Sequence, residues 1–532
     1  MTPHTPLARS LWEAESLDGI EPHTLSGLLR SAAQAHPDVL AQVDFEDRRQ
    51  WTYARLDADV TRLARRLRHT FARGERVAVW MPNCPEFVLL QCALARAGLI
   101  LVPVNPAYRE KELAYVLDQS AAAGVFYSRS YRGTDMHAIL GRAGADAPTV
   151  RHRIAVDEWD AYLGGEAAED GDPVVAPADP VQILYTSGTT GVPKGAVLSN
   201  QAITHSMITV AGNAGLKAGD VWINTMPMFH IGGLGHGTIA AISYGGTQVI
   251  MQRFETGKVM AAIETHGGTS LLLVPTMIID ILDHPQRHRY DLSTLRSVMV
   301  GGAPVTVALA QRVERELGVP LFNLFGQTET SGPIAQTRPT DSLRYRTETV
   351  GRPQRYVSVR VVDPAGEVVP VGATGEIQAR GRQVMSGYWD MAEATGRTLS
   401  DDGWLATGDV GSMDERGYLT VRSRLKDMII RGGENIYPRE IEEVLVAHPA
   451  VTGAAVVGLP DERWGEQVAA VLTADPAAVD AQALHDYVRA HLAPHKTPKR
   501  WFVTDVLPCT PSGKIQKFVV VERLRAGEFR EL

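Results

Sequence analysis

Residues 185–196 combine small hydroxyl side chains, three glycines and one lysine, a set of groups suited to gripping phosphate oxygens. Glycine lets backbone N–H groups turn toward an anion without a Cβ in the way, and lysine adds a mobile positive charge. The glycine–lysine–serine/threonine spacing of a Walker A loop is absent. We therefore predict a polyphosphate loop of another kind, whose donors are Thr186, Ser187, Gly188, Thr189, Thr190 and Lys194.

Three further glycine-rich or polar groups closely follow apolar runs that predict β-strands. These groups are His230 after 222–226, Gly301 and Gly302 after 297–300, and Thr328 and Glu329 after 321–325. In an open α/β sheet, ligands bind beyond the carboxyl ends of the strands. We therefore expect one crevice to collect these groups together with the phosphate loop, which follows its own apolar run.

Strand and helix patterns alternate along the first part of the chain, which implies a parallel sheet layered with helices. Thr52 is expected to cap a helix in which Leu56, Val60, Leu63 and Leu67 share one face. Further expected elements are helices at 87–97, ended by Gly98, at 111–118 and at 200–211, and strands at 77–80, 99–104, 124–127, 247–251 and 270–274.

The pattern changes near residue 350, where alternating valines and a turn at 363–366 predict a β-rich lobe of about residues 350–420. The last hundred or so residues alternate helices and strands in a compact pattern of their own. The predicted fold is therefore α/β, with a large N-terminal body of layered α/β subdomains and a β-rich lobe, residues 1–425. A small α+β C-terminal domain follows at residues 426–532.

Composition and charge narrow the class of protein. A chain of 532 residues is too long for a single core, and a net charge of −8 implies no general affinity for nucleic acid or anionic membranes. Three cysteines give neither a disulfide framework nor a metal-ligand spacing. No signal peptide or membrane span is visible, so we expect a cytoplasmic protein, either a homodimer or a monomer.

These stretches together resemble the acyl-adenylate-forming superfamily, which includes acyl-CoA synthetases, beetle luciferases and peptide-synthetase adenylation domains. Matching stretches begin at Asn83, Glu86 and Phe87, include the phosphate loop, and end at Lys514 in a Pro-Ser-Gly-Lys sequence. The resemblance implies a reaction in two halves. A carboxylate attacks the α-phosphorus of ATP to give acyl-AMP and pyrophosphate, and a thiol, usually of coenzyme A, then displaces AMP.

The resemblance also implies Mg²⁺ and a C-terminal domain that rotates between the two half-reactions. Glu329 would hold the metal, because a hard cation prefers a carboxylate near phosphate oxygens. Phe325 stands where the family usually has tyrosine against the adenine, and it keeps the stacking face without the hydroxyl. The other nucleotide-binding residues implied are the phosphate loop, Gly302, Ala303 and Pro304 at the adenine, Gly326, Gln327, and Thr328 at the α-phosphate.

Five residues toward the C-terminus acquire roles through the same resemblance. Asp409 and Arg424 would bind the ribose hydroxyls, and Lys426 would be the hinge. Gly433 would line the tunnel for the pantetheine arm, where a side chain would obstruct the thiol. Lys514 would be the catalytic lysine of adenylation, bridging the carboxylate and the α-phosphate as charge builds in the transition state.

The residues after His230 indicate the kind of acid that is activated. No Asp or Glu lies between Val221 and Phe254, which argues against an amino-acid substrate because its ammonium would be buried unpaired. A carboxylate is already ionised near neutral pH, so His230 is expected to pack or gate rather than act as a general base. The implied acyl pocket comprises His230, Ile231, Gly232, Leu234, Gly235 and Gly301.

The shape of this pocket is expected to be roomy and apolar. Glycines 232, 233, 235 and 237 would leave space, and Met226, Met228, Ile231 and Leu234 would form the walls. We therefore predict a sizeable apolar carboxylic acid (medium-chain, alicyclic or terpenoid) rather than acetate, and aryl acids remain open.

Three alternatives share most of these motifs. The thiol could belong to a carrier protein rather than coenzyme A, although no carrier domain is visible in the sequence. A luciferase-like oxygenase would share every nucleotide motif. A non-catalytic nucleotide-binding module would be expected to have lost Lys514, Glu329 or the phosphate loop, and all three are retained.

Overall fold

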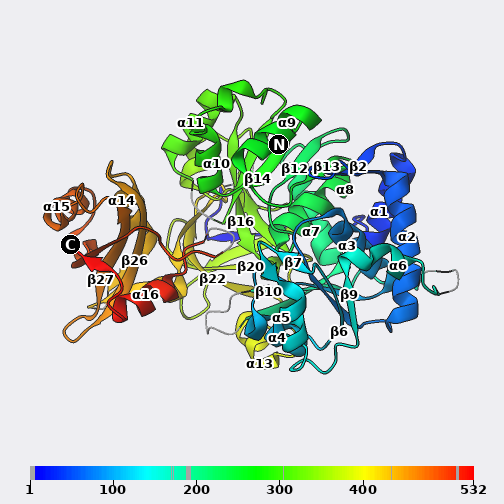
Figure 1. The fold of residues 1–532 in the computed structure, drawn as a ribbon. Coiled ribbons are helices and arrows are strands. Elements are labelled where there is room, and N and C mark those ends of the chain that lie inside the picture. The colour runs from blue at the N-terminus through cyan, green and yellow to red at the C-terminus, as the bar shows by residue number, and fades with distance from the viewer. Residues whose placement is uncertain are drawn as a thin grey trace. The chain divides into compact units, whose positions relative to one another are not determined.

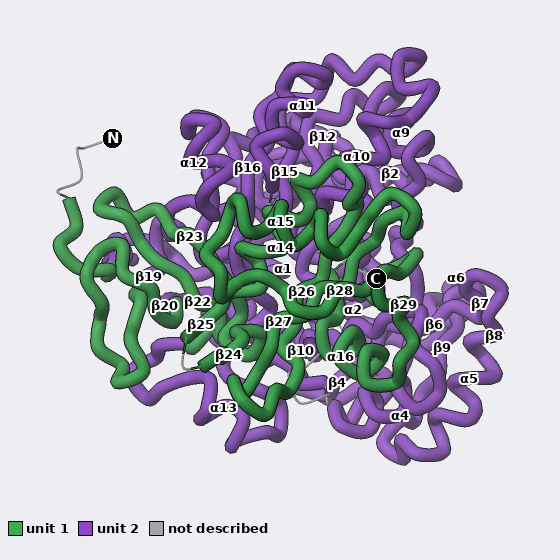
Figure 2. Tube along the Cα trace, turned by 90° about the vertical axis from the view of Figure 1, so that its left-hand side faces the viewer, with its two compact units in different colours: residues 1–11, 360–378, 406–532 green, residues 12–359, 379–405 purple. Residues whose placement is uncertain are grey.

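The computed structural model describes residues 6–168, 171, 173–186, 193–302, 305–432, 434–510 and 514–532. Its helices and strands are drawn in Figure 1. The chain forms two compact units, which Figure 2 distinguishes by colour. The larger unit contains residues 12–359 and 379–405, and the smaller one contains residues 1–11, 360–378 and 406–532. This is the α/β fold that the sequence predicts.

The first sheet of the larger unit has seven strands in the order β21-β11-β10-β5-β4-β6-β9. The run from β10 to β9 is parallel, and β11 and β21 extend it as antiparallel strands. The strand bounds are β4 Arg76–Trp80, β5 Ile100–Pro103, β6 Ala122–Tyr127, β9 His152–Ala155, β10 Pro180–Thr186, β11 Lys194–Ser199 and β21 Gly387–Tyr388.

The second sheet has nine strands in the order β18-β17-β16-β15-β14-β12-β13-β2-β3. The six strands from β16 to β2 are parallel, and antiparallel strands close both ends. The strand bounds are β2 Leu40–Asp44, β3 Gln50–Thr52, β12 Val221–Asn224, β13 Thr247–Ile250, β14 Ser270–Leu273, β15 Ser297–Gly301, β16 Leu321–Gln327, β17 Gly332–Gln336 and β18 Arg352–Pro353.

The helices predicted at 87–97, 111–118 and 200–211 are present as α3, α4 and α7, with bounds that differ by at most two residues. The Thr52 side chain accepts a hydrogen bond from the Arg55 N–H at 3.2 Å and starts α2, and Gly98 ends α3 with φ +70°. The helix bounds are α1 Leu25–Ala35, α2 Tyr53–Thr70, α3 Pro85–Ala97, α4 Glu110–Gln119, α5 Met136–Ala143, α6 Trp159–Leu163, α7 Asn200–Asn213, α8 Ala240–Tyr244, α9 Thr256–His266, α10 Pro275–Leu282, α11 Val307–Leu317, α12 Leu343–Glu348 and α13 Ala392–Thr398.

The C-terminal part folds as a small α+β structure. Its six-stranded sheet has the order β25-β24-β27-β28-β29, with β26 also paired to β27. A separate five-stranded sheet has the order β1-β19-β20-β22-β23. The bounds are β1 Leu11–Trp12, β19 Val357–Val362, β20 Gly375–Gly381, β22 Leu405–Met413, β23 Leu419–Arg424, β24 Ile429–Arg431, β25 Glu434–Ile436, α14 Pro438–Val446, β26 Val451–Asp461, β27 Gly465–Ala474, α15 Ala481–His491, β28 Arg500–Thr504, α16 Lys517–Arg525 and β29 Arg530–Glu531.

The segment between β20 and β22 does not stay with the β-rich strands around it. Its strand β21 pairs with β11 in the seven-stranded sheet of the larger unit. The reason is that the main chain of residues 385–389 bonds to the phosphate-loop hairpin and to the turn after β16, as described below. The domain boundary at residues 425 and 426 remains a prediction.

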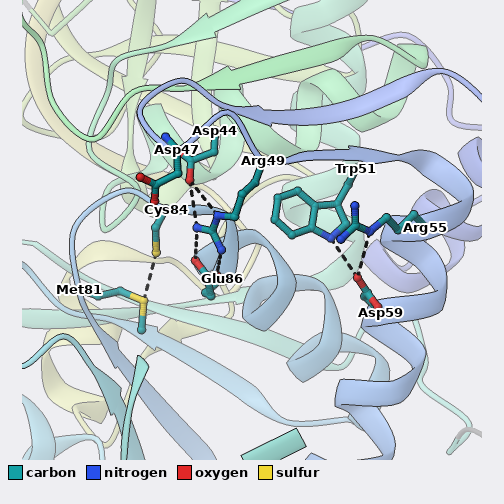
Figure 3. Close-up of polar contacts among 9 residues, drawn as sticks. All are labelled: Asp44, Asp47, Arg49, Trp51, Arg55, Asp59, Met81, Cys84 and Glu86. Carbon is teal, nitrogen blue, oxygen red and sulfur yellow. Dashed lines mark hydrogen bonds and ion pairs between the residues drawn. The ribbon is translucent and has the colours of Figure 1, made fainter. Parts of the chain in front are cut away.

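A charged cluster near the start of α3 connects the β2–β3 hairpin to that helix. Arg49 forms ion pairs with Asp44 at 3.0 Å and with Glu86, and the three side chains face one another in Figure 3. Glu86 is buried, so the guanidinium supplies the charge that its carboxylate needs in a low-dielectric site. The cluster therefore fixes the N-terminal turn of α3, which begins two residues after Asn83.

No helix among the residues that the structure describes has the length and apolar character needed to cross a bilayer.

Arg96 joins the first three helices from a fully buried position. Its guanidinium donates to Ser26 Oγ on α1 at 2.9 Å and to Thr61 Oγ1 on α2 at 2.6 Å, and it pairs with the Asp57 carboxylate at 2.5 Å. Arg96 Nη1 also donates to the Asp57 carbonyl oxygen at 3.1 Å, and because the side chain is 0% exposed, these bonds replace its lost hydration. One charged side chain on α3 thus fixes the packing of α1 and α2.

Replacing Arg96 should therefore cost far more stability than replacing an exposed arginine of the same region. We expect Arg96→Met to lower the free energy of unfolding by about 3 kcal/mol. The reason is that Ser26, Thr61 and Asp57 would lose their bonds to the guanidinium inside the protein. The measurement is the midpoint of urea denaturation. The control is Arg62→Met, whose exposed pair with Asp59 should contribute less than about 1 kcal/mol; equal effects of the two changes would contradict the argument.

Candidate active site

The phosphate-loop segment connects two antiparallel strands of the seven-stranded sheet. Thr186 at the end of β10 pairs in register with Lys194 at the start of β11. The Tyr115 hydroxyl donates to the Pro193 carbonyl oxygen at 2.8 Å, just before β11. Both ends of the loop are thus held, while residues 187–192 lie outside the described part.

Glu329 lies beside this hairpin. Strand β16 ends in a one-turn 3₁₀-helix, Thr328–Thr330, which buries Thr328 and Glu329. The Glu329 carboxylate accepts hydrogen bonds from the Tyr388 hydroxyl at 2.9 Å and from Thr186 Oγ1 at 3.5 Å. Both bonds end on Oε1, so among the described residues Oε2 keeps its lone pairs for another partner.

The close approach of β16 to β17 explains why residue 326, near the end of β16, is a glycine. A Cβ on Gly326 would lie only 2.1 Å from the carbonyl oxygen of Gly332. Any side chain there would push the two strands apart and move the 3₁₀-helix that follows. The glycine is therefore needed to hold Glu329 where the hairpin can reach it.

Tyr388 is a site residue that the sequence does not reveal. Its ring lies 5.0 Å from the Lys194 Nζ, so a single tyrosine contacts both the loop lysine and the Glu329 carboxylate. Burial, together with the neighbouring Glu329, raises the pKa of the Tyr388 hydroxyl above its ordinary value, which keeps it a donor at neutral pH. It comes from β21, 59 residues after Glu329, and carries no local motif.

Main-chain bonds hold the β21 segment on both neighbours. The Met385 N–H donates to the Glu329 carbonyl oxygen at 2.8 Å, and the Trp389 N–H donates to the Gly195 carbonyl oxygen at 2.8 Å. The segment therefore bridges the turn after β16 and the start of β11, with Tyr388 between them.

Asn83 organises the segment that leads to His230. Its amide donates to the carbonyl oxygens of Met226 at 2.9 Å and Met251 at 3.0 Å, and its carbonyl accepts from the Met228 N–H at 2.7 Å. His230 follows, and its Nδ1 accepts from the Gly232 N–H at 3.1 Å. A π-helix, Gly232–Ile239, begins there and is entirely buried. π-helical turns often occur at functional sites.

The expectation that four glycines leave room in this stretch is wrong for two of them. A Cβ on Gly233 would lie 2.3 Å from the Pro227 carbonyl oxygen, and one on Gly237 would lie 2.1 Å from the Asn224 amide. These two glycines allow close packing instead of open space. Gly232 and Gly235 have side-chain ends as neighbours. A Cβ on Gly232 would lie 3.4 Å from His230 Nδ1 and Met226 Cε, and one on Gly235 would lie 3.0 Å from Ile231 Cδ1 and 3.2 Å from Met207 Cε. The predicted walls Met226, Met228, Ile231 and Leu234 are buried.

The smaller unit brings together three of its predicted residues. Asp409 on β22 is opposite Arg424 on β23, and Asp409 Oδ1 pairs with the Arg424 guanidinium at 2.8 Å. Burial raises the pKa of the Asp409 carboxyl, while the positive charges of Arg424 and Lys514 oppose this rise. The Lys514 N–H donates to Thr510 Oγ1 at 3.1 Å.

The remaining predicted residues fall into two groups. Outside the described residues lie Ser187, Gly188, Thr189, Thr190, Ala303, Pro304 and Gly433. The described ones are Gly301 at the end of β15, Gly302 just after it, Phe325, Gly326 and Gln327 in β16, and Lys426 in a one-turn helix, Leu425–Asp427. Their roles remain predictions.

Two models of protein families match the chain. The model described as AMP-binding enzyme matches residues 29–389, and the model described as AMP-binding enzyme C-terminal domain matches residues 440–514. The first match alone covers more than half of the chain. The chain belongs to the AMP-binding enzyme family.

Similar proteins agree with this membership. A feruloyl-CoA synthase of Amycolatopsis sp. is 38% identical over 89% of this chain and 94% of its own. A Mycobacterium tuberculosis ligase, named for a propanoyl group on a methyl-dioxo-octahydroindene ring system, is 36% identical over 84% of this chain and 88% of its own. The o-succinylbenzoate coenzyme A synthetase MenE of Bacillus subtilis, solved with ATP and a magnesium ion, superimposes with a TM-score of 0.81 at 32% identity, covering 94% and 99% of the two chains.

The reaction class follows from this membership. The chain is an AMP-forming ligase that joins an acyl or aryl acid to coenzyme A, with ATP and a small-molecule acid as its other substrates. We propose roles for individual residues and a class of acid below.

Removing the Tyr388 hydroxyl should test its contact with Glu329. We expect Tyr388→Phe to lower kcat/KM for ATP about 10-fold, because a hydrogen bond to a charged partner is typically worth about 1.5 kcal/mol or more. Pyrophosphate release at several Mg²⁺ concentrations gives the measurement. Tyr162→Phe is the control, because it removes a hydroxyl that bonds Thr70 on α2 instead. Unchanged kinetics in Tyr388→Phe would show that the contact is not used.

The buried histidine of the π-helix predicts a dependence of stability on pH. Burial lowers the pKa of His236 to about 4, against 6.5 for an exposed histidine. Between these values the unfolded chain binds more protons, so the free energy of unfolding falls as the pH falls. The free energy of unfolding of the wild type should therefore fall between pH 7 and pH 5, and about 2 kcal/mol of this fall should be absent in His236→Leu. Urea denaturation at both pH values gives the measurement.

The control for this pH effect is His69→Leu, whose side chain is 43% exposed and pairs at 3.4 Å with the exposed Glu166, a kind of contact that contributes little to stability. That substitution should change the difference between pH 7 and pH 5 much less than His236→Leu does. The same pH dependence in wild type and His236→Leu would refute the assignment.

Proposed function

We propose that this chain is an ATP-dependent acid–CoA ligase for a bulky, largely apolar carboxylic acid, and that it works through acyl-AMP. The observation that carries the proposal is the cluster of Thr186, Lys194, Glu329 and Tyr388 at the base of the phosphate loop. The cluster consists of one cation, one carboxylate and two hydroxyls beside the two strand ends that flank residues 187–192.

The cluster suits a nucleotide triphosphate with its metal. Lys194 and the loop donors would hold the β- and γ-phosphates, and Thr328 would donate to the α-phosphate. Glu329 fits Mg²⁺, because its Oε2 is available and Mg²⁺ usually takes one or two carboxylates, with waters and phosphates as its other ligands. When bound, the ion would neutralise phosphate charge. No group of three His, Cys, Asp or Glu side chains within the described ranges forms a cluster that could hold a metal by itself.

The smaller unit holds a second group of residues with proposed nucleotide roles. The Asp409–Arg424 pair uses one carboxylate oxygen, which leaves Oδ2 to accept from the ribose hydroxyls. Lys514 would stabilise the charge that develops as the carboxylate oxygen bonds to the α-phosphorus and pyrophosphate leaves. In the second half-reaction, the thiolate of coenzyme A attacks the acyl carbon and AMP leaves.

The acid is inferred from the walls of the stretch after β12. Met226, Met228, Ile231 and Leu234 are all buried there, and no carboxylate is present to pair a substrate ammonium. The relatives named for feruloyl and octahydroindenyl groups support large ring-containing acids. We therefore favour medium-chain, alicyclic or terpenoid acids, with aryl acids as the second candidate because of the feruloyl-CoA synthase relative.

A panel of acids tests the substrate class. We expect kcat/KM for octanoate, cyclohexanecarboxylate or cinnamate to exceed that for acetate at least about 10-fold, since each buried methylene contributes roughly 0.8 kcal/mol. AMP and pyrophosphate release, measured with and without coenzyme A, reports both half-reactions. Preference for acetate would refute the apolar-acid proposal, and cinnamate outperforming both aliphatic acids would favour the aryl candidate.

The role of Lys514 is tested by separating the half-reactions. Lys514→Ala should slow acyl-AMP formation about 100-fold, as expected for a transition-state charge worth about 3 kcal/mol, and should leave thioester formation from supplied acyl-AMP nearly unchanged. The control is Lys499→Ala, an exposed lysine of the same unit. Equal loss of both half-reactions in Lys514→Ala would contradict the assignment.

A further inference from the structure

The interior of the larger unit contains polar atoms without partners close to the proposed acyl pocket. Ser206 Oγ on α7, His236 Nε2 in the π-helix and Ser331 Oγ after the Glu329 turn are buried, and no described residue bonds to them. Their side chains belong to residues that are at most 3% exposed. Leaving a buried polar atom unpaired is costly, so such a group points to a missing partner.

Two of these residues share one neighbour, Gly332. A Cβ on Gly332 would lie 3.4 Å from Ser206 Oγ and 3.5 Å from His236 Cε1. Both side chains therefore border the same small region, at the start of β17. That region is three residues from Glu329 and borders the π-helix that starts two residues after His230.

The hydrogen bonding of His236 determines which ligand group can pair with it. Its Nδ1 lies 3.2 Å from the Ile231 carbonyl oxygen, which can only accept, so Nδ1 carries the proton. Burial keeps the ring neutral, and Nε2 is then an acceptor. An acceptor in this position pairs with a hydroxyl or N–H group and disfavours an ionised carboxylate.

Met207 fills the space between these polar groups. Its Cε would lie 2.9 Å from a Cβ on Gly332 and 3.2 Å from a Cβ on Gly235. The thioether end therefore occupies the room that these two glycines leave. Methionine is unbranched and changes rotamer readily, so it can vacate this space for a ligand.

We propose that Ser206 and His236 form a polar subsite that binds a hydroxyl or N–H group on the body of the acid, with Met207 turning aside to admit it. The substrate class is then an otherwise apolar acid that carries one hydrogen-bond donor away from its carboxylate. This proposal rests on the proposed function, because it concerns the acid that is activated. A site built to bond a donor discriminates strongly against the analogue that lacks it.

Matched pairs of acids test the subsite. The pairs are 10-hydroxydecanoate with decanoate and 3-(4-hydroxyphenyl)propanoate with 3-phenylpropanoate, each assayed by AMP release with ATP and coenzyme A. We expect the hydroxy acid of at least one pair to have a kcat/KM about 10-fold or more above its partner. His236→Leu should reduce this ratio to about 1, and His236→Gln, which keeps an acceptor, should retain part of it.

The matched control is His205→Leu. His205 is also a buried histidine with an unpaired Nε2, but its ring lies against Tyr356 at 5.0 Å. This substitution should leave the hydroxy-to-deoxy ratio unchanged, and thermal denaturation of each variant confirms that it is folded.

The outcomes separate the two proposals. Equal rates within both pairs, or a ratio that survives in folded His236→Leu, would overturn the subsite while leaving the ligase intact. If His236→Leu does not fold, Ser206→Ala must lower the ratio in the same direction, and an unchanged ratio overturns the subsite. No AMP release with any acid would instead overturn the proposed function.

Discussion

The burial of the Glu329 carboxylate is the constraint on which the rest of the larger unit's site depends. A carboxylate removed from water needs donors or a cation close by. The described protein supplies two neutral donors, Tyr388 and Thr186, both directed at the same oxygen. Glu329 Oε2 and most of the negative charge of the carboxylate are therefore left without a partner among the described residues. A metal ion bound together with a polyphosphate could compensate this charge.

The elements around Glu329 follow from this constraint. Gly326 lets β16 and β17 approach closely enough to place the turn, and the register of β10 with β11 brings Thr186 opposite Lys194. The β21 segment adds Tyr388 and closes the cluster with main-chain bonds to both sides. Segments that are more than a hundred residues apart in the chain, such as those of Thr186 and Glu329, thus lie side by side. Each of them contributes a hydrogen-bond donor or a glycine that allows close packing.

Close packing also shapes the stretch that we propose binds the acid. Asn83 satisfies three main-chain groups around Met226 and Met228, and Gly233 and Gly237 allow backbone and amide groups to approach without a Cβ. The flexible side chains in this stretch are those of Met207 and Met226, which lie next to Gly235 and Gly232. In the proposed function, a rigid main chain with flexible thioethers would accept ring-containing acids while holding the reacting carboxylate in place.

The sequence by itself determined the alternation of strands and helices, the cap at Thr52, the end of α3 at Gly98 and the residues that closely follow the strands. These features depend on local periodicity and on side chains a few residues apart. Only the tertiary structure identified Tyr388, the role of Asn83, the packing of Gly233 and Gly237, and the unpaired atoms of Ser206 and His236. Those contacts join residues far apart in the chain, and whether a glycine leaves space or a buried atom lacks a partner depends on what the fold brings beside it.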